Sequence, residues 1–284
     1  MELLVVFKLV HRIFGNLDEA ENVEFRDKQA QKRQGELEMN AQIQLGQLKQ
    51  LRDELTRFMM TYKFALEEME TKIGILKQEF QTLHDYSPIE HTKSRLKSPE
   101  SIMNKMLRKQ IEPSIASIRA NIRDIAGLRI TCSFLSDIYR ISEMLQQQDD
   151  LTVLEVKDYI ANPKPNGYQS LHLLVEVPVF MSDRTERVGV EVQIRTIAMD
   201  FWASLEHKIF YKYNKTVPER LTRELKMAAD SAAALDRQME RLHHEIREIK
   251  DEDEDDSIEE LRRIIMGNQQ FNLPAHFIKL LNEA

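Results

Sequence analysis

The sequence contains a single cysteine, Cys132, among its 284 residues, so no disulfide can form within one chain. Cys132 lies in an apolar run from Leu128 to Phe134, where we expect a buried thiol rather than a nucleophile. Long hydrophobic runs are also lacking, because basic residues from Lys8 onward interrupt the apolar stretch Leu3 to Phe7 before it reaches the length of a signal-peptide core or a membrane span. We therefore expect a soluble protein of a reducing, cytoplasmic compartment that does not engage a membrane.

The chain has no excess of positive charge: its formal net charge is -7, which argues against a general nucleic-acid binder. The charge is unevenly placed, however. Residues 91–129 hold nine Lys or Arg against three Asp or Glu, a local excess of six positive charges. This segment is therefore where we look first for a site that binds anions.

A heptad pattern indicates a long helix in the first third of the chain. Apolar residues recur in steps of four and three at Leu55, Met59, Tyr62, Leu66, Met69, Ile73, Leu76, Phe80 and Leu83. Upstream, Asn22 to Gln50 is rich in Gln, Glu, Lys and Arg, so it forms either a solvated helix or a mobile arm. Pro88 ends the long helix, because the residue before a proline is pushed out of helical geometry.

The middle of the chain alternates predicted strands and helices. A basic helix over residues 98–110 begins with Ser98 as its N-cap and Pro99 at the first helical position. Strands are predicted at Ile125–Phe134, Leu151–Lys157, Leu171–Val177 and Val188–Ile194, and helices at Leu135–Gln148 and Ala198–Tyr211. The last two strands are joined by a polar turn and form an antiparallel pair. The fold class is therefore α/β or α+β, a mixed sheet with helices on it.

A second heptad stripe follows Pro218 and consists of Leu221, Leu225, Ala228, Ala232, Leu235, Met239, Leu242, Ile246 and Ile249. An acidic run, Asp251–Asp256, ends it, and short helices are predicted at Ile258–Ile265 and Phe277–Leu281. Both stripes could pack within the chain, but their length favours some burial between chains. We divide the chain into a helical or mobile extension (1–50), a long amphipathic helix (51–85), a catalytic domain (86–215) and C-terminal oligomerisation helices (216–284).

Basic side chains cluster before and at the start of the first predicted strand. The set comprises Arg95, Lys97, Lys105, Arg108, Lys109, Arg123 and Arg129. Transfer of a polyphosphate group needs cations on the phosphate oxygens and a metal-binding carboxylate nearby. A solvated basic face would account for the same residues, so the set alone does not decide between these interpretations.

Two carboxylates could hold a divalent cation near this basic set. Asp124 enters the first strand and faces the same region as Arg129. Glu191 leads another strand, on which Glu191, Gln193 and Arg195 share one face. Mg²⁺ is usually held by one or two protein carboxylates together with substrate phosphates. For either carboxylate alone, a salt bridge on a polar strand face is the simpler interpretation.

The loop Lys164-Pro165-Asn166-Gly167-Tyr168 displays an aromatic side chain just before a strand. A rigid aromatic in this position could stack on a nucleotide base, and His172 follows on the strand. Tyr168 could equally be a half-buried aromatic of the core.

These segments, in this order, resemble the synthetase domain of the RelA/SpoT family, and above all its compact members, the small alarmone synthetases. The resemblance covers residues 86–213 and rests on Ser87-Pro88-Ile89-Glu90, Arg95-Leu96-Lys97, Asp124 to Arg129, Lys164 to Tyr168, Glu191 to Thr196 and Phe201 to Lys208. Each motif is short, but six in register make coincidence implausible.

The resemblance implies an α+β fold, a nucleotidyltransferase-like mixed β-sheet flanked by helices, and a Mg²⁺-dependent GTP pyrophosphokinase. Such an enzyme moves the β,γ-diphosphate of ATP to the 3′-hydroxyl of GDP or GTP, giving ppGpp or pppGpp and AMP. It assigns catalysis and metal binding to Asp124 and Glu191, ATP binding to Arg95, Lys97, Lys105, Arg108 and Arg129, and GDP/GTP binding to Lys164, Asn166, Tyr168, His172, Gln193 and Arg195. In this assignment Tyr168 stacks on guanine.

The resemblance also implies a homo-oligomer, a tetramer built through the terminal helices, and no binding of nucleic acid is expected. His84-Asp85 is similar to a dipeptide of the family's hydrolase half, but we interpret it as the end of the long helix. Two other functions remain: a toxic relative that pyrophosphorylates adenine nucleotides or tRNA, and a non-catalytic scaffold.

Overall fold

The computed structural model describes residues 23–84, 86–210 and 218–252. The chain forms two compact units, Met1–Arg57 and Phe58–Ala284. In the first unit the described residues belong to helix α2 (Val23–Leu83), so the segment predicted as either a solvated helix or a mobile arm is helical from Val23 onward. The predicted helices beyond residue 252 and the apolar stretch near the N-terminus lie outside the described residues.

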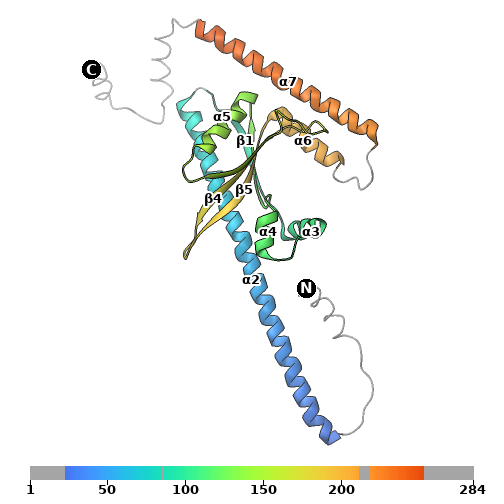
Figure 1. Cartoon of the computed structure of the whole chain (residues 1–284). Helices are drawn as coiled ribbons and strands as arrows, with labels where there is room; N and C mark the ends of the chain where they lie inside the picture. The colour runs from blue at the N-terminus through green and yellow to red at the C-terminus, as the bar shows by residue number, and fades with distance from the viewer. Residues whose placement is uncertain (1–22, 85, 211–217, 253–284) are drawn as a thin grey trace, which may run out of the picture. The chain divides into compact units, whose positions relative to one another are not determined.

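The second unit is built on a five-stranded mixed sheet (Figure 1). Its strands are β1 (Ile89–Leu96), β2 (Ala126–Cys132), β3 (Thr152–Asp158), β4 (Leu171–Phe180) and β5 (Thr185–Thr196), in the order β1-β2-β5-β4-β3. Strands β2 and β5 run parallel, and the other neighbours are antiparallel. The α+β class and the antiparallel pair of β4 and β5 are confirmed. Strand β1 was not predicted.

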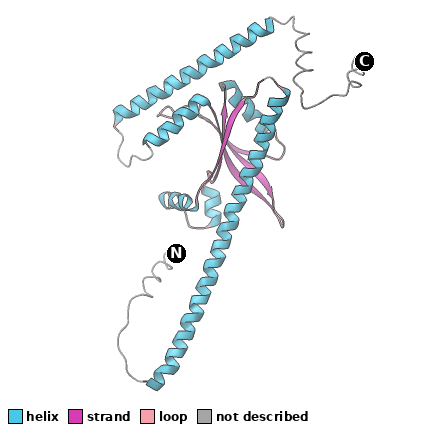
Figure 2. Cartoon of the chain, turned by 180° about the vertical axis from the view of Figure 1, so that it is seen from behind, coloured by secondary structure: helices cyan, strands magenta, loops and turns pink. Residues whose placement is uncertain are grey.

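The core lies between one face of the sheet and the part of α2 that belongs to the second unit, which crosses the sheet in Figure 2. Met69, Ile73 and Phe80 of the first heptad stripe are buried there. On β2 and β5 the even-numbered residues point into this core, and Ile130 and Ile194 are fully buried. The opposite face therefore carries the odd-numbered side chains. Most of the first stripe is used for packing within the chain.

The remaining helices are α3 (Pro99–Lys109), α4 (Ile115–Asn121), α5 (Leu135–Gln146), α6 (Ile197–Phe210) and α7 (Glu219–Glu252). Ser98 caps α3 as predicted, since its side chain accepts a hydrogen bond from the Ser101 N–H and Pro99 occupies the first turn. The short α4, capped by Ser114, was not predicted.

Helix α7 carries the second heptad stripe, which is mostly exposed. Leu225 and Ala232 of the stripe are half-buried, whereas Leu242, Ile246 and Ile249 are exposed, and the buried Ala229 and Ala233 lie beside the stripe. None of the helices among the described residues combines the length and apolar character needed to cross a bilayer. Cys132 is buried, as predicted, and burial raises the pKa of its thiol.

Candidate active site

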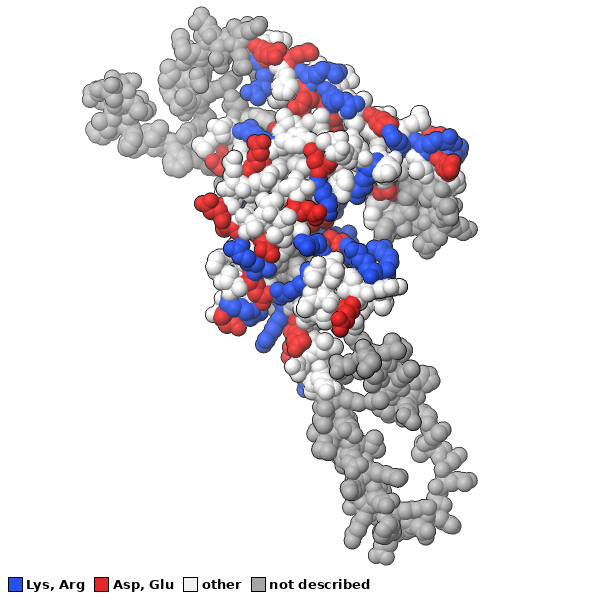
Figure 3. Space-filling view, in the orientation of Figure 1, with Lys and Arg blue, Asp and Glu red and all other residues white. Residues whose placement is uncertain are grey.

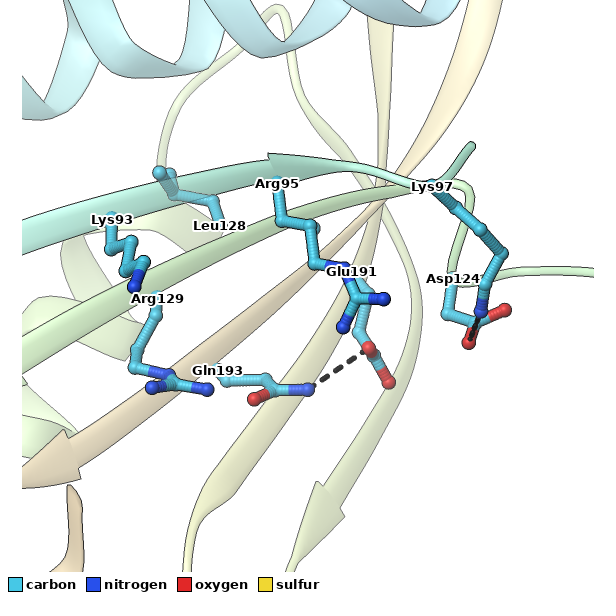
Figure 4. Close-up of a pocket in the computed structure, with 9 residues that line it drawn as sticks. Lys93, Arg95, Lys97, Asp124, Leu128, Arg129, Glu191 and Gln193 are labelled. Carbon is cyan, nitrogen blue, oxygen red and sulfur yellow. Dashed lines mark hydrogen bonds and ion pairs between the residues drawn. The ribbon is translucent and has the colours of Figure 1, made fainter. Parts of the chain in front are cut away.

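Strand pairing gathers the charged residues on the open face of the sheet. The parallel register sets Gly127 of β2 beside Glu191 of β5, and the antiparallel register of β1 sets Arg95 on the other side of Gly127. These strands line a pocket of about 270 Å³. Its residues are Lys93, Arg95, Lys97, Asp124, Gly127, Leu128, Arg129, Glu191 and Gln193, and Figure 4 shows eight of them labelled.

Asp124 sits at one end of this pocket, held by two lysines. Lys105, from α3, donates to Oδ1 at 2.7 Å, and Lys97, just after β1, donates to Oδ2. Burial alone would raise the pKa of Asp124, but the hydrogen bonds and charges of Lys105 and Lys97 outweigh it, and the pKa is lowered. Asp124 is therefore ionised at neutral pH, and it holds two ammonium groups beside it.

Glu191 lies on the floor of the same pocket. Gln193 Nε2 donates to its Oε2 at 3.0 Å, and His172 Nδ1 lies 3.4 Å from its Oε1. Burial raises the pKa of Glu191, but the contacts with His172 and Gln193 together outweigh burial, so the net shift is downward. The charge of Asp124 acts against that shift, which indicates that the two carboxylates sense each other across the pocket.

The chemistry of these two groups fits Mg²⁺. Both are carboxylates, the hard oxygen ligands that Mg²⁺ prefers, and the ion usually takes only one or two from the protein and the rest from phosphates and water. No group of three or more His, Cys, Asp or Glu side chains suited to a metal is found in the part of the chain that the structure describes. A structural zinc-type centre is thus not indicated there, whereas a cation shared with a phosphate ligand is compatible.

Beside the pocket, Tyr168 lies at the centre of a polar aromatic cluster. Its hydroxyl is 2.6 Å from Arg195 Nη2, which donates to it, and 2.7 Å from His172 Nε2. The Lys164 ammonium lies 4.7 Å from the centre of the Tyr168 ring and 4.5 Å from that of Tyr159. Tyr168 is half-buried, so it has both a packed edge and an accessible one.

The preceding loop requires glycine at position 167. Gly167 has φ of +88°, and a Cβ added there would lie 2.5 Å from the Cβ of Ala229 on α7. Asn166 Oδ1 accepts a hydrogen bond from the Tyr168 N–H at 3.2 Å, which shapes the turn. Nearby, Trp202 of α6 donates to the Leu225 carbonyl at 3.1 Å. The loop is thus fixed against α6 and α7.

Most residues implied by the resemblance come together. Arg95, Lys97, Arg129, Asp124, Glu191 and Gln193 line the pocket, and Lys105 reaches it through Asp124. Tyr168, His172 and Arg195 join it through Gln193, whose Oε1 accepts from Arg195 at 2.8 Å. Arg108 is exposed in the last turn of α3 and does not line the pocket, and Asn166 contacts its own loop instead.

Three further residues near the site were missed. Lys93 lines the pocket two positions before Arg95, a spacing that would have identified it had β1 been recognised as a strand. Tyr159 lies under the Lys164 ammonium. Asp200 accepts hydrogen bonds from both Arg129 and Arg195. Acidic residues are common in the first turn of a helix, so the sequence did not mark Asp200 as a partner of two arginines.

The sequence of the chain matches a known protein family over the region that forms this site. Residues 94–216 match the sequence profile of the region found in RelA / SpoT proteins. The chain is 53% identical over 195 residues to the GTP pyrophosphokinase YwaC of Bacillus subtilis, covering 69% of this chain and 93% of that relative. It is 40% identical over 192 residues to the GTP pyrophosphokinase YjbM of the same organism, covering 68% and 90%. The chain belongs to the RelA/SpoT family.

Solved structures narrow the likeness to the small members of that family. The small alarmone synthetase 2 of B. subtilis superimposes with a TM-score of 0.60 at 54% identity, covering 66% of this chain and 96% of that one. The small alarmone synthetase 1 of B. subtilis bound to its product pppGpp gives a TM-score of 0.63 at 39% identity, covering 68% and 98%. The same synthetase bound to AMPCPP gives 0.59 at 36%, covering 69% and 99%.

Proposed function

We propose that this protein is a GTP pyrophosphokinase that transfers the β,γ-diphosphate of ATP to the 3′-hydroxyl of GDP or GTP, releasing AMP and giving ppGpp or pppGpp, without a hydrolase activity. The observation that carries the proposal is the meeting of Arg95, Lys97 and Arg129 with two ionised carboxylates in one pocket. We assign the synthetase domain to residues 86–215.

On the donor side, Arg95 and Arg129 bracket the adenine of ATP, and Lys97 and Lys105 bind its phosphates. Both lysines already sit within hydrogen-bonding distance of Asp124, so a phosphate arriving here meets preorganised ammonium groups. Such groups stabilise the charge that builds on the transferred diphosphate. Arg108, exposed at the end of α3, assists from the pocket's edge.

Asp124 and Glu191 would hold Mg²⁺, which would supply charge neutralisation for the phosphate oxygens when bound. Glu191 is also the group that takes the proton from the attacking 3′-hydroxyl. Its lowered pKa keeps it ionised at neutral pH but makes it a weak base. The cations lining the pocket compensate by favouring the developing alkoxide.

On the acceptor side, guanine stacks on Tyr168, and Lys164, Asn166, His172, Gln193 and Arg195 bind or orient the nucleotide. A base stacked on Tyr168 would replace the Lys164 ammonium, which lies 4.7 Å from the ring centre, and would release it toward the acceptor's phosphates. His172, between the Tyr168 hydroxyl and Glu191, aligns the acceptor with the proton-accepting carboxylate.

We further propose a cytoplasmic homo-oligomer, a tetramer, whose contacts use the exposed stripe of α7. Leu242, Ile246 and Ile249 are about half exposed, and burying them against another chain would be favourable. Nucleic acid and membranes are not expected as partners. Acidic and basic side chains are interspersed over the face in Figure 3, and the basic groups form separate patches, not one continuous surface.

The proposal is tested by incubating the purified protein with Mg²⁺, labelled ATP and either GDP or GTP, and resolving the nucleotides chromatographically. A guanosine tetra- or pentaphosphate with an equal amount of AMP is the expected result. AMP without a guanosine product, or modification of added tRNA, would support a toxic relative instead. If no AMP forms at all, the remaining interpretation is a non-catalytic scaffold.

A further inference from the structure

One carboxylate joins the two halves of the site. Asp200 lies in the first turn of α6, directly after β5. Its Oδ1 is 2.9 Å from Arg129 Nη1 and 3.1 Å from Arg195 Nη1. Arg129 comes from β2 and lines the pocket, whereas Arg195 comes from β5 and donates to the Tyr168 hydroxyl. A single oxygen thus bridges a donor-side arginine and an acceptor-side arginine.

Arg195 depends on its partners because it is only 4% exposed. Its guanidinium donates to Ser170 Oγ at 3.3 Å, to Gln193 Oε1 at 2.8 Å and to the Tyr168 hydroxyl at 2.6 Å. All three of these acceptors are neutral. Among the described residues, Asp200 is the carboxylate that forms an ion pair with Arg195. Burying a guanidinium without a counter-charge is strongly unfavourable.

The two arginines also repel each other. Burial lowers the pKa of Arg129, the charge of Arg195 lowers it further, and Asp200 acts in the opposite direction. The Nε atom of Arg129 is buried without a hydrogen-bond partner in the described structure, so the Asp200 contact at Nη1 is a main constraint on where this guanidinium points. Without the negative charge of Asp200, the two neighbouring guanidinium groups would repel each other and move apart.

Helix capping does not account for Asp200. The Met199 N–H donates to Thr196 Oγ1 at 3.1 Å, so Thr196 caps the start of α6. Thr196 in turn donates to Asp236 Oδ2 of α7 at 2.7 Å, which anchors the same turn. The Asp200 carboxylate instead points to the arginines.

We propose that Asp200 is a positioning residue shared by both nucleotide sites: by holding Arg129 and Arg195 on one oxygen, it fixes the adenine-side arginine and the Tyr168 side of the acceptor site together. The inference rests on the proposed function, because it takes Arg129 as a donor-site group and Tyr168 as an acceptor-site group. It adds a residue whose loss affects both substrates.

The test is the Asp200→Asn variant, which keeps the size of the side chain and removes its charge. We expect KM to rise about tenfold for ATP and about tenfold for the guanine nucleotide, the scale of a lost charge-assisted contact, while kcat changes less. Asp200→Glu restores the charge and should return both constants to within about threefold of the wild type. The matched control is Asp230→Asn, because Asp230 is an exposed carboxylate that pairs with Lys226 on α7; it should behave like the wild type.

A rise in one KM only, or none, would overturn the shared role, as would failure of Asp200→Glu to restore either constant. Calorimetric titration with a non-hydrolysable ATP analogue and, separately, with GDP gives the same comparison without turnover. If Asp200→Asn fails to fold, these titrations are made on Asp200→Ser, which also removes the charge and whose affinities for both ligands must fall together. A wild type that binds both nucleotides but forms no product would refute the proposed function and leave the inference about Asp200 open to the titrations.

Discussion

Replacing Glu191 with glutamine tests the chemistry with little change in shape. The Gln193 amide donates to Oε2 of Glu191 at 3.0 Å, and the carbonyl oxygen of a glutamine could accept the same bond. The substitution removes the negative charge and the proton-accepting oxygen. Removal of a general base costs about 10²- to 10⁴-fold in kcat, which corresponds to about 2.7–5.4 kcal/mol of transition-state stabilisation at about 1.36 kcal/mol per tenfold.

The assay measures AMP and guanosine product at saturating ATP and GDP, together with the melting temperature. We expect Glu191→Gln to lose turnover by that factor and to melt within about 3 °C of the wild type, since no buried packing is removed. The matched control is Glu176→Gln on β4, because Glu176 pairs with Gly189 on the neighbouring stretch of the sheet and does not line the pocket. A folded Glu191→Gln variant that retained turnover within threefold of the wild type would refute the reasoning.

Four other outcomes are expected. Gly167→Ala should raise the KM for the guanine nucleotide and lower stability by about 1–2 kcal/mol or more, because a left-handed backbone and a contact of 2.5 Å both oppose the added Cβ; denaturant melts and the KM for ATP, which should change less, check this. The pKa of Asp124 is lowered by Lys105 and Lys97 despite burial, so the ionised carboxylate stabilises the fold above the ordinary carboxyl pKa, and this contribution disappears as the pH falls through the lowered value. The difference in melting temperature between the wild type and Asp124→Asn should therefore shrink below about pH 4. A difference that stays constant with pH would contradict this reasoning. Cys132 should react with a thiol reagent only when the protein unfolds, because the thiol is buried and burial raises its pKa. Its labelling should therefore increase over the same range of denaturant concentration in which the protein unfolds. Ile246→Glu should reduce the mass measured by light scattering from an oligomer toward the monomer while leaving the circular dichroism of the helices intact, and an unchanged mass would exclude this stripe as the contact.

The sequence predicted the strands of the sheet's interior better than its edge. On β5, buried and half-buried residues alternate from Val190 to Ile194, so both the strand and the open face of Glu191 could be inferred. On β1 only Ile89 is buried, and the charged residues that follow give no alternation. An edge strand whose charged side chains, such as Arg95, line a pocket therefore looks like a loop in the sequence.

The heptad stripes show a different limit. Periodicity predicted both long helices, but the same spacing serves an intrachain core and a contact between chains. Met69 and Ile73 of α2 turned out to be buried within the second unit, whereas Ile246 and Ile249 of α7 are exposed. Only the tertiary structure distinguishes the two, because the pattern records that a face is apolar and not what covers it.

The interpretations left open for Asp124 and Tyr168 were not exclusive alternatives. Asp124 does form salt bridges, with Lys97 and Lys105, and this pairing is what would keep a phosphate site assembled before phosphate arrives: the carboxylate holds the ammonium groups in place, and they keep it ionised for a cation. Arrival of a phosphate with its counter-ion would exchange these partners without leaving any of the three charges unpaired. Tyr168 is likewise packed at its hydroxyl end by Arg195 and His172, which fixes the ring so that its remaining surface can meet a base. In both cases the structural interaction is the physical means by which the side chain is preorganised for its proposed role.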